Sequence, residues 1–233
     1  MREEFAREAR LIGDDGVALL RQKTVAVFGI GGVGGQAAEA LARGGIGKLV
    51  LIDNDTVSMS NINRQIIALH STVGLPKTQV MAARIQDICP ATIVETHAMF
   101  YLPETADSLP FDGWDYIIDA IDTVSGKLEI AVRAKAANIP LISCMGTGNK
   151  LDPTKLTVTD IYKTDTCPLA KVMRRELKKR GIDALQVVYS TEPPITPQTD
   201  DGEKRVPASI SFVPPAAGLL AAGTVIKALL KQK

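Results

Sequence analysis

A glycine-rich turn between an apolar run and a helix-like segment is the feature that most limits the possible folds of this chain. Residues 24–30, TVAVFGI, are almost entirely apolar, and residues 37–43, AAEALAR, have helical spacing. Where the two segments meet, Gly29, Gly31 and Gly34 fit the pattern G-x-G-x-x-G. A continuous apolar run suits a strand that is buried on both faces of a parallel sheet. The turn therefore predicts a strand–turn–helix unit of a doubly wound α/β sheet.

The same turn is suited to holding phosphate groups. Glycine places no Cβ between the backbone and an anion, and the amino end of the following helix offers N–H groups and partial positive charge. Asp53 ends the next apolar run, 48–53, where a carboxylate can accept hydrogen bonds from ribose hydroxyls. Together these features predict an adenine-nucleotide site. The glycines expected at the phosphates are Gly29, Gly31, Gly32 and Gly34.

Strand-like and helix-like segments alternate through the first part of the chain, which favours a mostly parallel sheet with helices on both faces. Gly13 is expected to separate the first two helices. Beyond the elements already named, strands are predicted over 91–99, 114–122 and 139–146, and helices over 2–12, 14–21, 76–88 and 124–138.

The pattern changes after Lys150. We predict a single Rossmann-like domain over residues 1–233, in which 1–150 form the nucleotide-binding core and 151–233 form a C-terminal α/β elaboration on the substrate side. Within the second part, strands are predicted over 155–162 and 184–190, helices over 168–180 and 215–230, and a polar, proline-rich loop over 191–209.

Composition excludes a strongly charged or membrane-embedded class of protein. The 233 residues are 45% hydrophobic with a formal net charge of +1, so any attraction to nucleic acid must come from a local basic surface. The longest apolar stretch, 212–230, is interrupted by Pro214, Pro215 and Lys227 and predicts a buried or interface helix. No apolar signal segment is expected at the N-terminus, and no membrane partner.

The three cysteines, Cys89, Cys144 and Cys167, form no C-x-x-C pair. This argues against a zinc site or a disulfide framework and leads us to expect a cytoplasmic, reducing environment. Cys167 precedes Pro168 at a predicted helix start, where helix amides favour a reactive thiolate. It can capture an acyl group as a nucleophile or serve as a packed thiol or helix cap, and the sequence leaves both roles open.

A polar and charged cluster follows the second predicted strand, near the edge of the sheet where ligands bind. Hydride transfer to a nicotinamide does not need Arg and Lys beside the phosphates, whereas a triphosphate does, because Arg holds oxygens bidentately and Lys is a compact charge. The cluster therefore favours ATP. Its members are Asn61, Asn63, Arg64, Gln65 and Lys77.

Two carboxylates, Asp119 and Asp122, end the fourth predicted strand as D-A-I-D. Carboxylates are hard oxygen ligands suited to Mg²⁺ together with phosphates. Both are candidates for a magnesium site, although Asp119 can instead cap the following helix.

Taken together, these motifs resemble the ubiquitin-activating-enzyme-like adenylating family of the ThiF/MoeB type. The segments that carry the resemblance are GIGGVGG at 29–35, GIGKLVLIDNDTVSMSNINRQ at 45–65, TVGLPKTQV at 72–80 and IIDAID at 117–122.

The resemblance implies a role for each of these residues. Asp53 would hold the ribose, with Asp55 and Asn63 also at the nucleotide. Phosphates would be held by Asn61, Arg64, Gln65 and Lys77, and Mg²⁺ by Asp122 with Asp119. It also implies a homodimer in which Arg7 of one subunit reaches the phosphates of the other. Arg7, Arg64 and Lys77 would be electrostatic stabilisers of an acyl-adenylation, with Asp122 as the fourth catalytic residue.

The second half resembles the tRNA threonylcarbamoyladenosine dehydratase subgroup of that family. This implies that ATP activates the threonyl carboxylate of the modified adenosine in the tRNA anticodon loop, and that cyclisation follows with net loss of water. The alternatives are an adenylyltransferase for the C-terminal Gly-Gly of a sulfur-carrier protein and a nucleotide-sensing module, and sulfur-transfer helper proteins are a further possible class of partner. The matching segments are 162–182, 187–194 and 205–230.

A group of basic side chains on the predicted helix 168–180 bears on the tRNA hypothesis. Helical spacing places most of them opposite the apolar positions Leu169, Val172, Met173 and Leu177, with Glu176 as the one opposing charge. Such a stripe is suited to a phosphate backbone, and an ordinary solvated helix face has the same pattern. The basic residues are Lys171, Arg174, Arg175, Lys178, Lys179 and Arg180.

Overall fold

A seven-stranded sheet organises the computed structural model, which describes residues 3–196 and 207–231. The strand order is β3-β2-β1-β4-β5-β7-β6, and all neighbours are parallel except β6 and β7. This confirms the predicted mostly parallel α/β class. The strands are β1 Thr24–Phe28, β2 Lys48–Ile52, β3 Ile93–His97, β4 Tyr116–Asp119, β5 Leu141–Cys144, β6 Leu156–Asp160 and β7 Gln186–Ser190.

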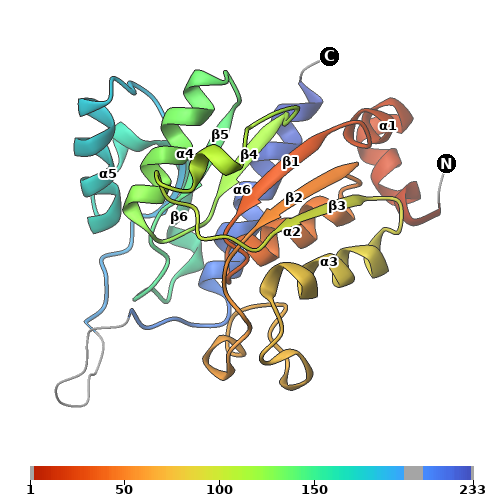
Figure 1. Ribbon diagram of the computed structural model, residues 1–233, viewed down its shortest axis with the longest axis horizontal. Helices are drawn as coiled ribbons and strands as arrows, with labels where there is room; N and C mark the ends of the chain where they lie inside the picture. Colours follow the sequence, from red (N-terminus) through yellow and green to blue (C-terminus); the bar gives the residue numbers. More distant parts are fainter. Residues whose placement is uncertain (1–2, 197–206, 232–233) are drawn as a thin grey trace.

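Helices cover both faces of the sheet (Figure 1). One face carries α1, α2, α3 and α6, and the other carries α4 and α5. Short 3₁₀ turns occur in the connections. The helices are α1 Ala6–Leu20, α2 Gly34–Arg43, α3 Lys77–Ile88, α4 Val124–Ala136, α5 Pro168–Lys179 and α6 Val213–Leu230.

The central strand β1 supplies side chains to two separate cores. Successive residues of a strand point to opposite faces of the sheet. Val25 and Val27 join the core under α2 and α6, whereas Phe28 joins the core on the other face. There the ring of Phe28 packs edge-on against Tyr101, with centroids 4.8 Å apart. The uninterrupted apolar sequence of β1 reflects this burial on both sides.

The break predicted at Gly13 is present, because Gly13 has φ 78° and ψ 163° inside the segment Ala6–Leu20. Glycine reaches this backbone conformation without the penalty that other residues incur. The first helix is preceded by a 3₁₀ turn at Glu3–Phe5, and Phe5 is buried beside Gly45, where it packs with Val17 and Cys89.

Several strands are shorter than predicted, and β4 and β5 end early for the same physical reason. Strand β4 ends at Asp119 and β5 ends at Cys144, although the apolar character of the sequence continues beyond both. The following residues, including Ile121 and Met145, line a cavity instead of continuing the sheet. Apolar pattern alone does not distinguish these two forms of burial.

Helix α6 packs beside α2 on the same face of the sheet (Figure 1), and it begins at Val213, two residues before its predicted start. Among the described residues it is the one helix with the length and mean hydropathy of a membrane span, at 1.6, and 44% of that span is buried. Its Gly218 allows a close approach, since a Cβ there would lie 2.2 Å from the carbonyl oxygen of Val33. The helix is thus a core element that supports the glycine-rich turn.

The second half of the chain extends the same sheet. Strand β7 pairs in parallel with β5, and β6 pairs antiparallel to β7 at the sheet edge. The core of α5 and β7 is continuous with residues of α4. Of the predicted loop 191–209, residues 197–206 lie outside the described residues.

Candidate functional site

A cavity of about 650 Å³ opens at the carboxyl ends of β1, β2, β4 and β5. From β1 the chain passes to β2 on one side, and β4 lies on the other side. The direction in which successive strands are added to the sheet therefore reverses between β1 and β4. Open α/β sheets bind ligands at such a switch point. The cavity is lined by the glycine-rich turn, by residues after β2 and β4, and by residues 144–148 after β5.

The glycine-rich turn closes so tightly that two of its glycines are sterically required. Gly29 has φ 85°, and a Cβ on it would lie 2.8 Å from the carbonyl oxygen of Ala120. A Cβ on Gly34 would lie 1.7 Å from the carbonyl oxygen of Gly29. Gly31 and Gly32 line the cavity. The amino end of α2 therefore meets the cavity with bare backbone, as an anion site requires.

Asp53 follows β2, and its carboxylate forms a hydrogen bond with the backbone of the glycine-rich turn. Its Oδ2 accepts a hydrogen bond from the Ile30 amide at 2.6 Å, and its Oδ1 accepts one from the Asp55 amide at 2.8 Å. Burial raises the pKa of Asp53, and the Lys77 ammonium opposes that rise. Each carboxylate oxygen retains a further lone pair, so Asp53 can still accept from a hydroxyl in the cavity.

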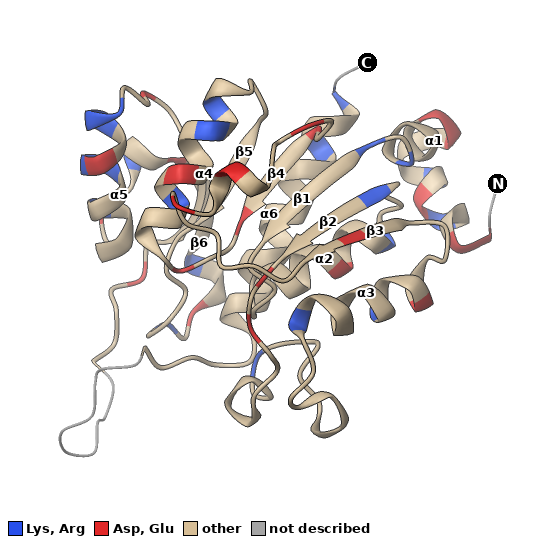
Figure 2. Cartoon of the chain, viewed as in Figure 1, with Lys and Arg blue, Asp and Glu red and all other residues tan. Residues whose placement is uncertain are grey.

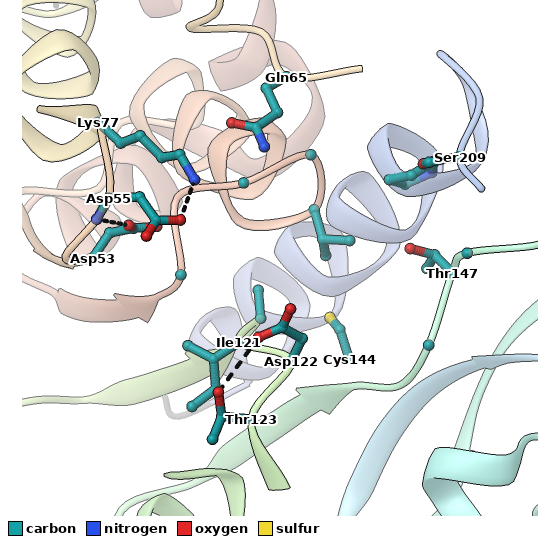
Figure 3. A pocket seen from close by; sticks show the side chains of 18 of the residues that line it. Asp53, Asp55, Gln65, Lys77, Ile121, Asp122, Thr123, Cys144, Thr147 and Ser209 are labelled. Atoms are coloured by element: carbon teal, nitrogen blue, oxygen red, sulfur yellow. Dashed lines mark hydrogen bonds and ion pairs between the residues drawn. The ribbon is translucent and has the colours of Figure 1, made fainter. Parts of the chain in front are cut away.

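Lys77 and Gln65 lie on the same side of the cavity as Asp53 and Asp55 (Figure 3). Lys77 begins α3 and is 5% exposed, and its Nζ lies 2.7 Å from Asp55 Oδ2. Gln65 is also buried, and its Oε1 accepts no hydrogen bond from any described residue. A buried amide oxygen without a partner is costly, which points to a polar ligand at this position.

The remaining members of the polar cluster surround Arg64. Its NH1 donates to the Ser60 carbonyl at 2.8 Å and to Asn63 Oδ1 at 2.9 Å, and Arg64 itself lines the cavity. Asn63 Nδ2 donates to the carbonyl of Ser209 at 3.0 Å, which joins this cluster to the C-terminal part of the chain. Asn61 is buried and accepts from the Ser58 amide, so it shapes the turn as well as lining the cavity.

The structure separates the two predicted magnesium ligands. Asp122 is exposed to the cavity, where its Oδ1 lies 3.5 Å from the Thr123 hydroxyl (Figure 3). Asp119 is fully buried and does not line the cavity. Its Oδ2 forms an ion pair with Lys127 Nζ at 3.0 Å, and Lys127 is also fully buried. Asp119 is therefore a core residue whose partner the sequence analysis missed.

Arg7 lies far from this cavity. It is an exposed residue of α1, which leads into the amino end of β1, at the opposite edge of the sheet (Figure 1). Within one chain the structure does not bring Arg7 to the cavity.

A family model described as the ThiF family matches residues 5–233. The chain belongs to the ThiF family.

Individual relatives agree with this family. The tRNA threonylcarbamoyladenosine dehydratase of Bacillus subtilis is 45% identical over 245 aligned positions, which cover 100% of this chain and 96% of that protein. Crystal structures of the Escherichia coli enzyme, TcdA, in complex with AMP and with ATP align with TM-scores of 0.92 and 0.91. Each is 37% identical, covering 99% of this chain and 95% of the other. The adenylyltransferase and sulfurtransferase MOCS3 of Anopheles gambiae is 28% identical over 48% of its length.

Sequence reasoning missed the wall of this ThiF-family cavity that follows β3. Met99, Phe100 and Tyr101 line it, and Phe100 is 48% exposed. The hydroxyl of Tyr101 is buried and bonds to none of the described residues. These residues follow a parallel strand as directly as Asp53 follows β2, so the same rule could have found them.

The basic residues of α5 form a partly neutralised surface (Figure 2). Glu176 pairs with Arg175 at 3.1 Å, Lys179 at 2.9 Å and Arg180 at 3.1 Å. These three cations lower the pKa of Glu176 to about 2. Arg174 turns inward and donates to the carbonyl of Thr164 at 2.7 Å. The predicted stripe therefore exists as an exposed face, with Arg174 held at its buried margin.

Cys167 is buried at the N-cap of α5, with 3% exposure, and makes no capping hydrogen bond through its side chain. It packs among residues of the α4–α5 core, and a Cβ on Gly146 would lie 3.9 Å from its sulfur. This placement favours the packed thiol over a nucleophile.

Proposed function

We propose that this chain is an ATP-dependent tRNA threonylcarbamoyladenosine dehydratase. The observation that carries the proposal is a nucleotide-sized cavity at the sheet's switch point, with a bare glycine turn, a buried lysine and a facing carboxylate, in a chain 45% identical to a dehydratase of that name. The whole chain would form one ThiF-type domain, because both halves share one sheet. Since its substrate is tRNA, the site of action would be the cytoplasm.

We place ATP with its phosphates along the turn at 29–34. Lys77 and Arg64 would neutralise phosphate oxygens, and the unpartnered Oε1 of Gln65 would accept a hydrogen bond from a donor group of the nucleotide. Asp53 would accept from the ribose hydroxyls while it holds the turn. The base would lie toward Met99–Tyr101, because these residues form the apolar wall after β3.

Asp122 would hold Mg²⁺. Of the two aspartates of D-A-I-D it is the one that reaches the cavity, and magnesium commonly takes one or two carboxylates together with phosphate oxygens. Among the described residues no group of three or more His, Cys, Asp or Glu side chains forms a self-sufficient metal site, which suits an ion shared with the substrate. When bound, the ion would neutralise charge on the phosphates.

The reaction then follows from charge neutralisation and positioning. A carboxylate oxygen of the threonyl group attacks the α-phosphorus of ATP, and pyrophosphate leaves. The carbamoyl nitrogen next attacks the acyl carbon, loses its proton, and AMP leaves with the former carboxylate oxygen. The cyclic product therefore has one water fewer than the substrate. Arg64 and Lys77 would stabilise charge in the first step without carrying protons.

A homodimer would complete the site. Because Arg7 is exposed at the far edge of its own sheet, it can act on phosphates only in a second subunit. The anticodon stem would lie against the basic face of α5 and its C-cap Arg180, where the exposed basic residues Lys171, Arg175, Lys178, Lys179 and Arg180 outnumber the single carboxylate of Glu176.

The test is incubation of the protein with ATP, Mg²⁺ and tRNA from cells that lack this activity, followed by mass spectrometry of the nucleosides. Loss of one water from threonylcarbamoyladenosine, dependent on ATP, is the expected result. tRNA without that modification is the control. Pyrophosphate exchange that a Gly-Gly carrier protein stimulates and modified tRNA does not would overturn the proposal in favour of a carrier-protein adenylyltransferase.

A further inference from the structure

A fully buried polar cluster lies directly beneath the cavity. It consists of Lys127 on α4, Asp119 at the end of β4 and Ser143 on β5, which we call the Lys127 cluster. Lys127 Nζ donates to Asp119 Oδ2 at 3.0 Å, to Ser143 Oγ at 3.3 Å and to the carbonyl of Cys144 at 2.8 Å. All three donors of the ammonium are therefore used, in the absence of solvent.

Both carboxylate oxygens of Asp119 accept hydrogen bonds as well. Ser143 donates its hydroxyl to Asp119 Oδ2 at 2.5 Å, and the amide of Ile121 donates to Asp119 Oδ1 at 3.3 Å. The cluster thus joins α4 to the carboxyl ends of two neighbouring strands. A buried ion pair rarely stabilises a fold more than well-packed apolar residues of the same size, so stability alone does not explain this one.

Both strand ends that the cluster joins continue directly into the site. Residues 120–123 and 144–145, which we call the pocket floor, all line the cavity (Figure 3). Asp119 precedes the first of these segments and Ser143 precedes the second. The cluster therefore fixes the positions of the carboxyl ends of β4 and β5 relative to each other. It does so with charge-assisted hydrogen bonds, which tolerate little change in distance or angle.

The pocket floor has little room to move independently of the turn above it. The amide of Ala120 donates to the Phe28 carbonyl at 2.8 Å, and the carbonyl of Ala120 lies 2.8 Å from the position of a Cβ on Gly29. On its other side, a Cβ on Gly126 would lie 2.7 Å from the Ile121 side chain. Any shift of Asp119 is thus passed both to the glycine turn and toward Asp122.

From this geometry we infer that Lys127 is a positioning residue, which holds the pocket floor, and with it Asp122, in register with the glycine-rich turn. The inference concerns the nucleotide site and rests on the proposed function only in that the nucleotide is ATP. Lys127 itself does not line the cavity, so it acts through Asp119 and the carbonyl of Cys144.

The test compares a variant of the Lys127 cluster with a control variant that lowers stability without touching the cluster. Lys127→Met with Asp119→Asn removes both charges and keeps the volume, so that no unpaired buried charge remains. Ile130→Ala, one turn further along α4, removes buried apolar contacts only and is the matched control. For each, thermal unfolding is measured first, then ATP affinity by calorimetry with and without Mg²⁺, and finally turnover on modified tRNA.

We expect the double variant to fold and to lose about tenfold or more in ATP affinity with Mg²⁺, whereas Ile130→Ala melts earlier and keeps the wild-type affinity. Ser143→Ala, which removes only a hydroxyl, is expected to lose affinity by a smaller factor. The same assay on Ser143→Ala decides the question if the double variant fails to fold. Wild-type affinity in the folded variants would overturn the inference. Normal ATP binding by wild-type protein with no reaction on tRNA would instead count against the proposed function alone.

Discussion

Lys77 holds Asp55 at 2.7 Å across the mouth of the nucleotide cavity, and the two residues differ sharply in exposure. The lysine side chain is 7% exposed and the aspartate side chain 57% exposed. The ammonium is thus fixed while its carboxylate partner borders solvent. We therefore expect that a phosphate oxygen entering the cavity takes the place of Asp55 without moving Lys77.

Removal of this ammonium is expected to impair adenylation strongly. Lys77→Ala should lower turnover by about 10²–10³-fold, the range found for a single electrostatic stabiliser of a transition state, and Arg64→Ala should act in the same direction. Lys48→Ala removes a lysine that pairs with Glu95 and does not line the cavity, so it is the control. Pyrophosphate-release kinetics measure all three. Unchanged turnover in Lys77→Ala together with Arg64→Ala would remove the basis for an ATP site.

Two adjacent glycines should respond oppositely to alanine. Gly34→Ala places a Cβ 1.7 Å from the Gly29 carbonyl oxygen and must displace the turn. We therefore expect the Gly34→Ala protein that remains soluble to bind no nucleotide. Gly35→Ala meets its nearest atom, on Ile66, at 3.6 Å, an ordinary contact. Because alanine is the better helix former by about 1 kcal/mol, Gly35→Ala should keep or raise stability. Thermal unfolding and ATP calorimetry on both variants check this, and equal behaviour of the two would contradict it.

The Glu39 ion pairs should give a pH-dependent contribution to stability. Burial raises the pKa of Glu39, but Arg84 and Arg43 outweigh burial and hold this pKa below its ordinary value of 4.5. A lowered native pKa means that the contribution is present above pH 4.5 and is lost as pH falls through the native pKa. Glu39→Gln should therefore cost about 1–3 kcal/mol at pH 7 and progressively less in acid.

Urea unfolding of wild type and Glu39→Gln between pH 7 and pH 3 measures this difference. Glu104→Gln, on the exposed surface, is the control and should stay within about 0.5 kcal/mol throughout. A Glu39→Gln deficit that does not shrink in acid would show that the carboxylate charge is not the cause.

Replacement of Cys167 should leave catalysis intact. The thiol is buried in the α4–α5 core, so Cys167→Ala should cost about 1 kcal/mol of stability and change turnover less than about twofold. An obligatory thioester would instead cost about a thousandfold or more, as loss of a covalent nucleophile does. Single-turnover assays with modified tRNA separate the two outcomes.

The exposed lysines of α5 should contribute to tRNA affinity without distinguishing one tRNA sequence from another. Lys171→Glu with Lys178→Glu should weaken binding and lower the salt dependence of the association constant by about one unit for each lost phosphate contact. Lys227→Glu, on α6 across the sheet, changes charge without altering α5 and is the control. Fluorescence titrations at several salt concentrations measure the slope. An unchanged slope would place the tRNA elsewhere on the molecule.

The local sequence predicted the parts of the fold that depend on neighbours in the chain. The glycine turn, the break at Gly13 and the alternation of strands and helices each follow from a short pattern. The antiparallel pairing of β6 with β7 did not, because strand order depends on contacts between distant segments. The same is true of the ends of β4 and β5, where apolar residues leave the sheet to line a cavity.

The two aspartates of D-A-I-D show the same limit in the site. Both have the residue type of a metal ligand and both follow one strand, yet only Asp122 reaches the cavity. Asp119 is paired with Lys127, eight residues further along the chain, and the sequence analysis did not predict this pairing. A charged residue inside the apolar face of a predicted helix is a signal that could have indicated a buried partner.

The close approach of α6 to the turn has a consequence for the order in which the protein is made. Gly218 lies against the carbonyl of Val33, so the support for a motif near the start of the chain comes from residues translated almost two hundred positions later. A nascent chain on the ribosome consequently lacks that support until α6 has emerged from the exit tunnel. We therefore expect nucleotide binding to begin only after α6 has been synthesised.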